Sequence, residues 1–119
     1  MEILQIDDST VICDLYEDLL SFRGHSISSV NDGRVGLELV SKNDYDLILL
    51  DICMPGYGGM EFLEDLKCQK PSELKKVIII SQLELDETQL DELSKFEIHS
   101  IQTKPSDLMS LETPEKLVV

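Results

Sequence analysis

Short apolar runs with the character of β-strands recur along the chain. The two strongest, residues 47–50 and 77–80, consist only of Leu, Ile and Val, which is typical of strands buried on both faces. Three weaker runs, residues 1–7, 25–30 and 97–102, complete a set of five. We expect residues 77–81 to form a central strand of the resulting sheet.

Between these runs the apolar residues repeat with helical spacing. Ile12, Leu15, Tyr16 and Leu19 fall on one predicted helix face, and Gly24 follows as a C-terminal glycine. Further helices are predicted to begin at Asn31 or Asp32, after the glycines of residues 56–59, at the capping box formed by Asp86 and Gln89, and at Ser106 or Thr113.

The alternation of five strands with helices, joined by short loops, indicates the α/β class. We predict one open, doubly wound, five-stranded parallel sheet with helices on both faces, and one domain over residues 1–119. Right-handed crossovers then place the carboxyl end of every strand at the same edge of the sheet. Ligands of such sheets bind at this edge, so the residues that end the strands are the first candidates for a site.

The balance of charge narrows the possible partners. Ten Lys and Arg residues stand against 24 Asp and Glu residues, a formal net charge of −14. We therefore expect no direct nucleic-acid binding and no membrane binding. The chain has neither a secretory signal pattern nor an apolar run near the roughly 20 residues of a spanning helix, which favours a cytoplasmic protein. Cys13, Cys53 and Cys68 are predicted to be reduced, packed thiols.

Polar residues end four of the predicted strands: Asp7 and Asp8, Asp51, Ser81, and Lys104. Two carboxylates about 4 Å apart repel by roughly 1 kcal/mol in water and by about 4 kcal/mol at an effective dielectric of 20. Three of them in one cleft imply compensation by a cation, by a proton or by the lysine, and Mg²⁺ with phosphate oxygens fits such a donor set. The pattern favours phosphoryl transfer with Asp51 as the nucleophile, Lys104 as a counter-ion and Ser81 as a hydrogen-bond donor.

These residues resemble the receiver domain of two-component response regulators. The likeness is carried by Ile6-Asp7-Asp8-Ser9, by residues 49–55 followed by Gly59, by Ile80-Ser81 and by Thr103-Lys104-Pro105. The resemblance implies a flavodoxin-like sheet of order 2-1-3-4-5. It also implies that a histidine kinase or a histidine phosphotransfer protein phosphorylates Asp51.

The same resemblance implies further roles around the acceptor. Asp8, Asp51 and the backbone carbonyl of Cys53 would bind Mg²⁺ directly, with Asp7 assisting through water. Ser81 would be the hydroxyl that moves toward the phosphoryl group, and Lys104 its counter-ion. Phosphorylation would change a partner-binding face around the fourth helix, the fifth strand and the last helix. An effector protein or a covalently linked output domain would bind that face.

Several positions depart from the family pattern. Ile101 stands where many receivers have an aromatic residue that rotates inward, and Gln82 stands where a small residue is usual. Cys53 and Leu83 place apolar side chains at the two variable positions beside the path of the attacking water. These departures concern the switching mechanism and the rate of dephosphorylation rather than the fold.

Two other functions fit parts of the sequence. One is a receiver-like interaction module that does not use phosphate, which the residues Gln82 and Ile101 suggest. The other is an aspartate-nucleophile phosphohydrolase of the haloacid-dehalogenase kind, but Cys53 stands where that chemistry needs a second aspartate. We therefore expect no enzyme beyond a domain that catalyses its own phosphoryl transfer and dephosphorylation. His25 and His99 are isolated and predict no metal site.

Overall fold

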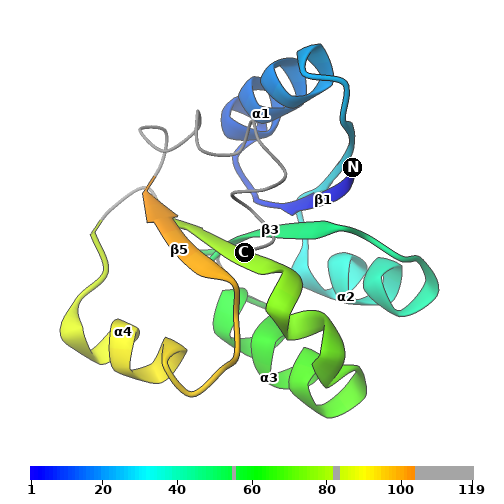
Figure 1. The fold of residues 1–119 in the computed structure, drawn as a ribbon. Coiled ribbons are helices and arrows are strands. Elements are labelled where there is room, and N and C mark those ends of the chain that lie inside the picture. Colours follow the sequence, from blue (N-terminus) through cyan, green and yellow to red (C-terminus); the bar gives the residue numbers. More distant parts are fainter. Residues whose placement is uncertain (55, 82–83, 104–119) are drawn as a thin grey trace.

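The computed structural model describes residues 1–54, 56–81 and 84–103. Five parallel strands form one sheet in the order β2-β1-β3-β4-β5 (Figure 1). The strands are β1 (Glu2–Ile6), β2 (Ser26–Val30), β3 (Leu47–Asp51), β4 (Val77–Ser81) and β5 (Ser100–Thr103). The predicted fold class is confirmed, including the strand order that the resemblance implied.

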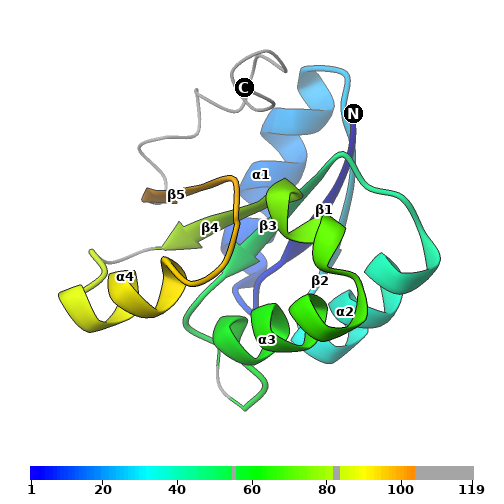
Figure 2. The same ribbon diagram turned by 60° about the horizontal axis from the view of Figure 1, so that its bottom comes forward.

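Helices cover both faces of the sheet. In Figure 2, α2 and α3 lie in front of the strands and α1 lies behind them. The helices are α1 (Thr10–Phe22), α2 (Gly33–Lys42), α3 (Gly59–Gln69) and α4 (Glu87–Leu93), with a 3₁₀ helix, η1 (Pro71–Lys76), before β4. The last predicted helix, at Ser106 or Thr113, lies outside the described residues.

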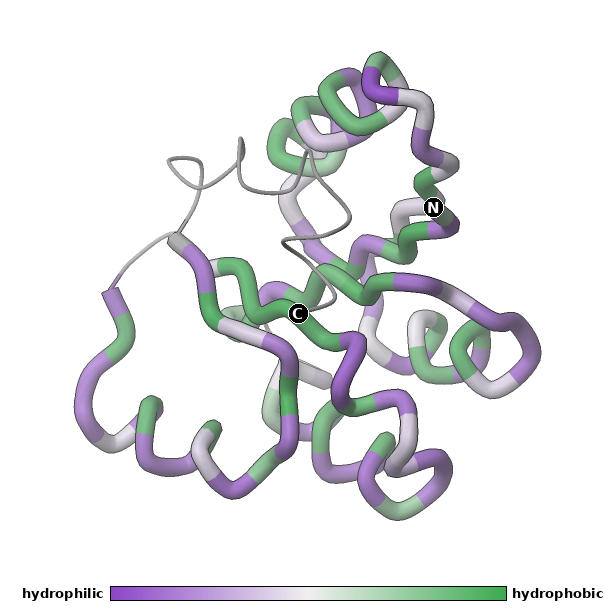
Figure 3. Tube along the Cα trace, in the orientation of Figure 1, coloured by the Kyte–Doolittle hydropathy of each residue, from purple (hydrophilic) through white to green (hydrophobic). Residues whose placement is uncertain are grey.

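Each face of the sheet has its own apolar core. On one face, strand residues such as Ile48 and Ile79 pack with Phe62 of α3 and Leu93 of α4. On the other face, Leu49 and its neighbours pack with α1. β3 and β4 are buried at every position, so the residues that end them are held in a rigid frame. Figure 3 shows this concentration of hydrophobic residues on the interior strands.

The predicted face of α1 is wrong in one respect. Ile12 and Tyr16 are buried as expected, but Leu15 is 42% exposed, while Cys13 and Leu20 are buried. The buried stripe runs through positions spaced by four residues and includes Cys13, so Leu15 falls on the flank of the helix. Gly24 ends the helix with a φ of 88°, as the sequence predicted.

Other boundaries differ less. Asp32 caps α2, and Asp86 and Gln89 exchange the predicted capping-box hydrogen bonds at the start of α4. β5 begins at Ser100 instead of residue 97, and the 3₁₀ helix after Pro71 was not predicted. The three cysteines are free, but only Cys13 is buried, so the prediction of packed thiols is wrong for Cys53 and Cys68.

Candidate functional site

Three carboxylates converge at the carboxyl edge of the sheet. Asp7 directly follows β1 and Asp51 ends β3, and these strands are paired with Ile6 opposite Leu50. Asp8 is the next residue after Asp7 in the turn that leads to α1. One carboxylate oxygen from each of the three residues lies within 4.8 Å of the other two. The parallel topology therefore brings together residues that are more than forty positions apart in the sequence.

The three carboxylates differ in burial. Asp7 is 2% exposed and Asp51 is 7% exposed, whereas Asp8 is exposed at the surface of the site. A pair of carboxylates at this separation repels by about 1 kcal/mol in water and by about 3 kcal/mol at an effective dielectric of about 20. A hard divalent cation relieves that repulsion and prefers oxygen ligands. The cluster therefore fits a divalent metal ion.

Hydrogen bonds to the backbone fix the turn that carries Asp7. The Asp7 N–H donates to the carbonyl of Val30 at 3.0 Å, and its Oδ1 accepts from the Ser9 N–H at 2.9 Å. The Ser9 hydroxyl in turn accepts from the Ile12 N–H and caps α1. Ser9, and not Asp8, is therefore the N-cap of α1. The carboxylate of Asp8 lies instead beside that of Asp51.

The loop after β3 is tied to the carboxylate of Asp51. The Cys53 N–H donates to Asp51 Oδ1 at 3.3 Å, and the Cys53 side chain is exposed. Met54 follows and is buried in the core on the α2 and α3 side. The backbone of Cys53 thus lies close to the Asp51 side chain, as a metal-binding carbonyl at this position would require.

Ser81 lies at the same edge of the sheet. It ends β4, one residue beyond Ile80, which is paired with Asp51, and it is buried. On its other side Ser81 is paired with Thr103 of β5. The structure therefore brings Asp7, Asp8, Asp51 and Ser81 to one edge. Lys104, together with Gln82 and Leu83, lies outside the described residues.

Ile101 occupies β5 opposite Ile79 and is 39% exposed. Ile101, which replaces the aromatic residue of many receivers, therefore lies at the surface on the edge strand of the sheet. His25 and His99 are both partly buried and far from each other in the sequence, and the cluster of possible metal ligands found in the described ranges contains neither of them.

Gly59, the first residue of α3, packs directly against the end of β3. A Cβ atom at this position would lie 2.8 Å from Ile52 Cα and 2.9 Å from the Asp51 carbonyl oxygen. Both neighbours are backbone atoms of the segment that positions Asp51. The close approach therefore needs a residue without a side chain at position 59. The sequence alone does not show this requirement.

We expect Gly59→Ala to lower the free energy of unfolding by about 1–3 kcal/mol, because the added methyl group must displace buried backbone. Gly24→Asn is the matched control, since a Cβ at Gly24 meets no atom within 4 Å and asparagine tolerates its left-handed φ. Chemical denaturation of both variants measures the difference. Equal destabilisation by the two substitutions would contradict this view of Gly59.

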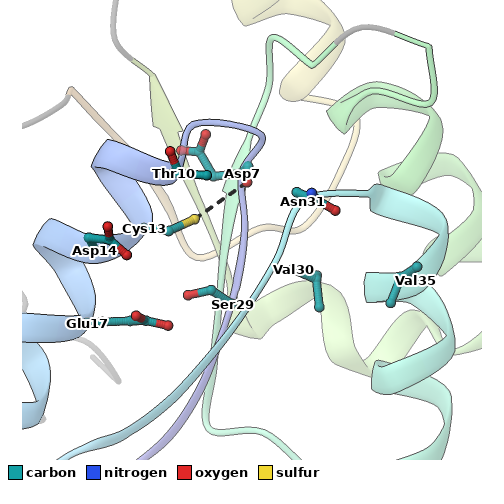
Figure 4. Close-up of a pocket in the computed structure, with 9 residues that line it drawn as sticks. All are labelled: Asp7, Thr10, Cys13, Asp14, Glu17, Ser29, Val30, Asn31 and Val35. Carbon is teal, nitrogen blue, oxygen red and sulfur yellow. Dashed lines mark hydrogen bonds between the residues drawn. The ribbon is translucent and has the colours of Figure 1, made fainter.

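Two hollows lined by described residues adjoin the carboxylates. The larger, of about 380 Å³, lies between α1, β2 and α2 (Figure 4), and in it the Cys13 thiol donates to the Asp7 carbonyl at 3.5 Å. The smaller, of about 150 Å³, is lined by Asp8, Asn31, Asp32, Arg34, Met54, Gly56 and Tyr57. Arg34 and Tyr57 were not among the predicted site residues, because their proximity to Asp8 depends on how α2 and the loop after β3 pack.

Comparisons with known proteins agree with this geometry. The sequence profile of the response regulator receiver domain matches residues 3–114. The transcriptional regulatory protein HprR of Escherichia coli is 43% identical over 70 residues, which cover 59% of this chain and 31% of HprR. The uncharacterized transcriptional regulatory protein YclJ of Bacillus subtilis is 31% identical over 121 residues, covering 100% of this chain and 51% of YclJ.

A solved structure shows the same fold. The signal receiver domain of a signal transduction histidine kinase from Syntrophus aciditrophicus matches with a TM-score of 0.80 and 26% identity, over 98% of this chain and 89% of that one. The chain spans about half or less of the length of the two curated relatives. In the described part of the chain, no helix is long and apolar enough to cross a membrane.

Proposed function

Because this chain belongs to the response regulator receiver domain family, we propose that it is a phosphoacceptor switch in which Asp51 accepts the phosphoryl group. The observation that carries the proposal is the convergence of the Asp7, Asp8 and Asp51 carboxylates at the carboxyl edge of the sheet. Asp51 ends a fully buried strand, so its position is fixed before any ligand binds. Residues 1–119 act as a single receiver domain in this proposal.

The chemistry follows from the residues at this edge. A carboxylate oxygen of Asp51 forms the new bond to phosphorus, the bond from phosphorus to the donor breaks, and the donor leaves with the electron pair. Ser81 donates a hydrogen bond to a phosphoryl oxygen, and Lys104 acts as its counter-ion. Asp8, Asp51 and the Cys53 carbonyl would hold Mg²⁺, with Asp7 assisting through water, and the ion would supply neutralising charge for the phosphoryl oxygens.

The partners follow from the same role. A histidine kinase or a histidine phosphotransfer protein supplies the phosphoryl group, and an effector or a covalently linked output domain responds to it. Phosphorylation changes the face formed by α4, β5 and the last helix that the sequence predicts. The net charge of −14 argues against direct contact of this domain with nucleic acid or an anionic membrane, and we place it in the cytoplasm.

The test is phosphorylation of the purified chain by a small acyl phosphate. We expect a Mg²⁺-dependent gain of one phosphoryl group in the intact mass, and no gain when a chelator removes the metal. In a second arm of the test, the chain is incubated with phosphate esters, the substrates of an aspartate phosphohydrolase, and the released phosphate is measured. Lack of uptake in the presence of Mg²⁺, or release of many equivalents of phosphate from esters, would overturn the proposal.

One observation favours a second candidate, a receiver-like module whose partner binding does not depend on phosphate. Ile101, on the edge strand β5, is a surface residue without the aromatic ring of many receivers. Binding of a captured partner with equal affinity to the phosphorylated and unphosphorylated chain would support this candidate, even if Asp51 takes up phosphate.

A further inference from the structure

Tyr57 lies in the loop between β3 and α3, and its ring packs against the start of α2. A Cβ atom at Gly33 would lie 2.7 Å from Tyr57 Cδ1, so the ring occupies the space that a side chain at position 33 would need. The guanidinium carbon of Arg34 lies 4.9 Å from the centroid of the same ring. Gly33 and Arg34 therefore hold the ring by packing and by a cation–π contact.

The hydroxyl of Tyr57 ties the same loop to α3. It donates to the carboxylate of Asp65, and the carbonyl oxygen of Glu61 lies 3.4 Å from it. Burial, followed by the hydrogen bond to Asp65, raises the pKa of Tyr57 above its ordinary value. The hydroxyl therefore keeps its proton, and remains a donor, throughout the neutral pH range.

This loop also forms part of the carboxylate site. It begins at Asp51, whose Oδ1 accepts the Cys53 N–H, and it ends at Gly58, whose N–H donates to Glu61 Oε2 at 3.1 Å. Tyr57 and Asp8 line the same hollow of about 150 Å³. The Tyr57 contacts thus hold the loop that follows the acceptor between two helices, beside the carboxylate at the surface of the site.

We propose that Tyr57 is a positioning residue for the divalent-cation site, acting through the described loop residues 52–54 and 56–58. This proposal rests on the proposed function, because the site it concerns is that of the phosphoacceptor. Its ring sets the distance of the loop from α2, and its hydroxyl sets the distance from α3. Tyr57 itself contacts neither the metal nor the phosphoryl group. Cation binding to a loop that is already ordered avoids the entropic cost of ordering it.

The experiment measures Mg²⁺ affinity by calorimetry on the full chain. Residues that orient metal ligands change affinity by about 10–100-fold when they are altered. We expect Tyr57→Ala to weaken Mg²⁺ binding by about tenfold, and Tyr57→Phe, which keeps the ring but removes the hydroxyl, by about threefold. Asp65→Asn keeps an acceptor for the hydroxyl and is expected to bind like wild type, whereas Asp65→Leu is expected to match Tyr57→Phe.

Tyr45→Phe is the matched control. Tyr45 is also partly buried against the core, but it precedes β3, at the opposite end of the strand from Asp51. Faster amide exchange confined to residues 52–54 and 56–58 in the Tyr57 variants would support the proposed route. The proposal is overturned if Tyr57→Phe and Asp65→Leu bind Mg²⁺ within twofold of wild type, or if wild type binds none.

The same experiment separates this proposal from the proposed function. Cation affinities are measured without a phosphodonor, so they test Tyr57 even if the chain takes up no phosphoryl group. In that case the proposed function fails while the affinities still decide the role of Tyr57. Conversely, wild type could be phosphorylated normally while the Tyr57 and Asp65 variants bind Mg²⁺ with unchanged affinity. That result would overturn only the inference about Tyr57.

Discussion

Asp51→Asn is expected to abolish phosphoryl uptake from a small acyl phosphate, with a loss of about a thousandfold or more in rate. The amide is a poor nucleophile at this position, although it has almost the same shape as the carboxylate. Its oxygen can still accept the N–H of Cys53, so the loop keeps the hydrogen bond that it makes in wild type. Intact-mass spectrometry over a time course measures the rate.

Asp44→Asn provides the control for this substitution. Asp44 is exposed and precedes β3, at the end of the strand opposite to Asp51. The Asp44→Asn substitution changes the net charge by the same amount without altering the carboxylate cluster. The rate of phosphoryl uptake by this variant should therefore equal that of wild type. Uptake by Asp51→Asn at the wild-type rate would show that another side chain accepts the phosphoryl group.

The fold could be predicted from local patterns wherever burial decides the structure. The runs at 47–50 and 77–80 are strands because both of their faces are covered, and the strand order came from the family resemblance rather than from the runs themselves. Local patterns were less informative at the helix surfaces. Leu15 has the right spacing to be buried, but the axis of α1 over the sheet turns it outward, and the position of that axis is a tertiary property.

The site was predictable as far as it depends on strand ends. Asp51 and Ser81 each end a strand, and Asp7 and Asp8 are the first two residues after β1. A parallel sheet must collect such residues at one edge. The parts that escaped prediction depend on contacts between distant segments. Nothing local to Gly33 indicates that the ring of Tyr57 will fill the space beside it, and nothing near Gly59 indicates the approach of the Asp51 carbonyl.

Asp8→Asn is expected to have opposite effects on the metal-free and the metal-bound protein. Without metal, the substitution removes one of three carboxylates that lie within 4.8 Å of each other. Because Asp8 is exposed, each of the two repulsions that it makes is about 1 kcal/mol in water and is further weakened by salt, so we expect the free energy of unfolding to rise by about 1 kcal/mol. In Mg²⁺, we expect the affinity to fall by more than about tenfold, because the negative charge of a proposed direct ligand is lost.

The two effects make the stability curves cross as Mg²⁺ is added. A ligand that binds only the folded state stabilises it by about 2.7 kcal/mol at a concentration of 100 times its dissociation constant. At the same concentration, a variant that binds about tenfold more weakly gains about 1.4 kcal/mol, so wild type gains about 1.3 kcal/mol more. This difference exceeds the deficit of about 1 kcal/mol that wild type has without Mg²⁺, and the curves therefore cross. Asp14→Asn is the control, because it removes the same charge from α1. Asp14 lines the larger hollow and does not belong to the carboxylate cluster, so the stability of this variant should match that of wild type at every Mg²⁺ concentration. Thermal unfolding over a Mg²⁺ series measures all three proteins, and parallel curves for wild type and Asp8→Asn would exclude Asp8 as a ligand.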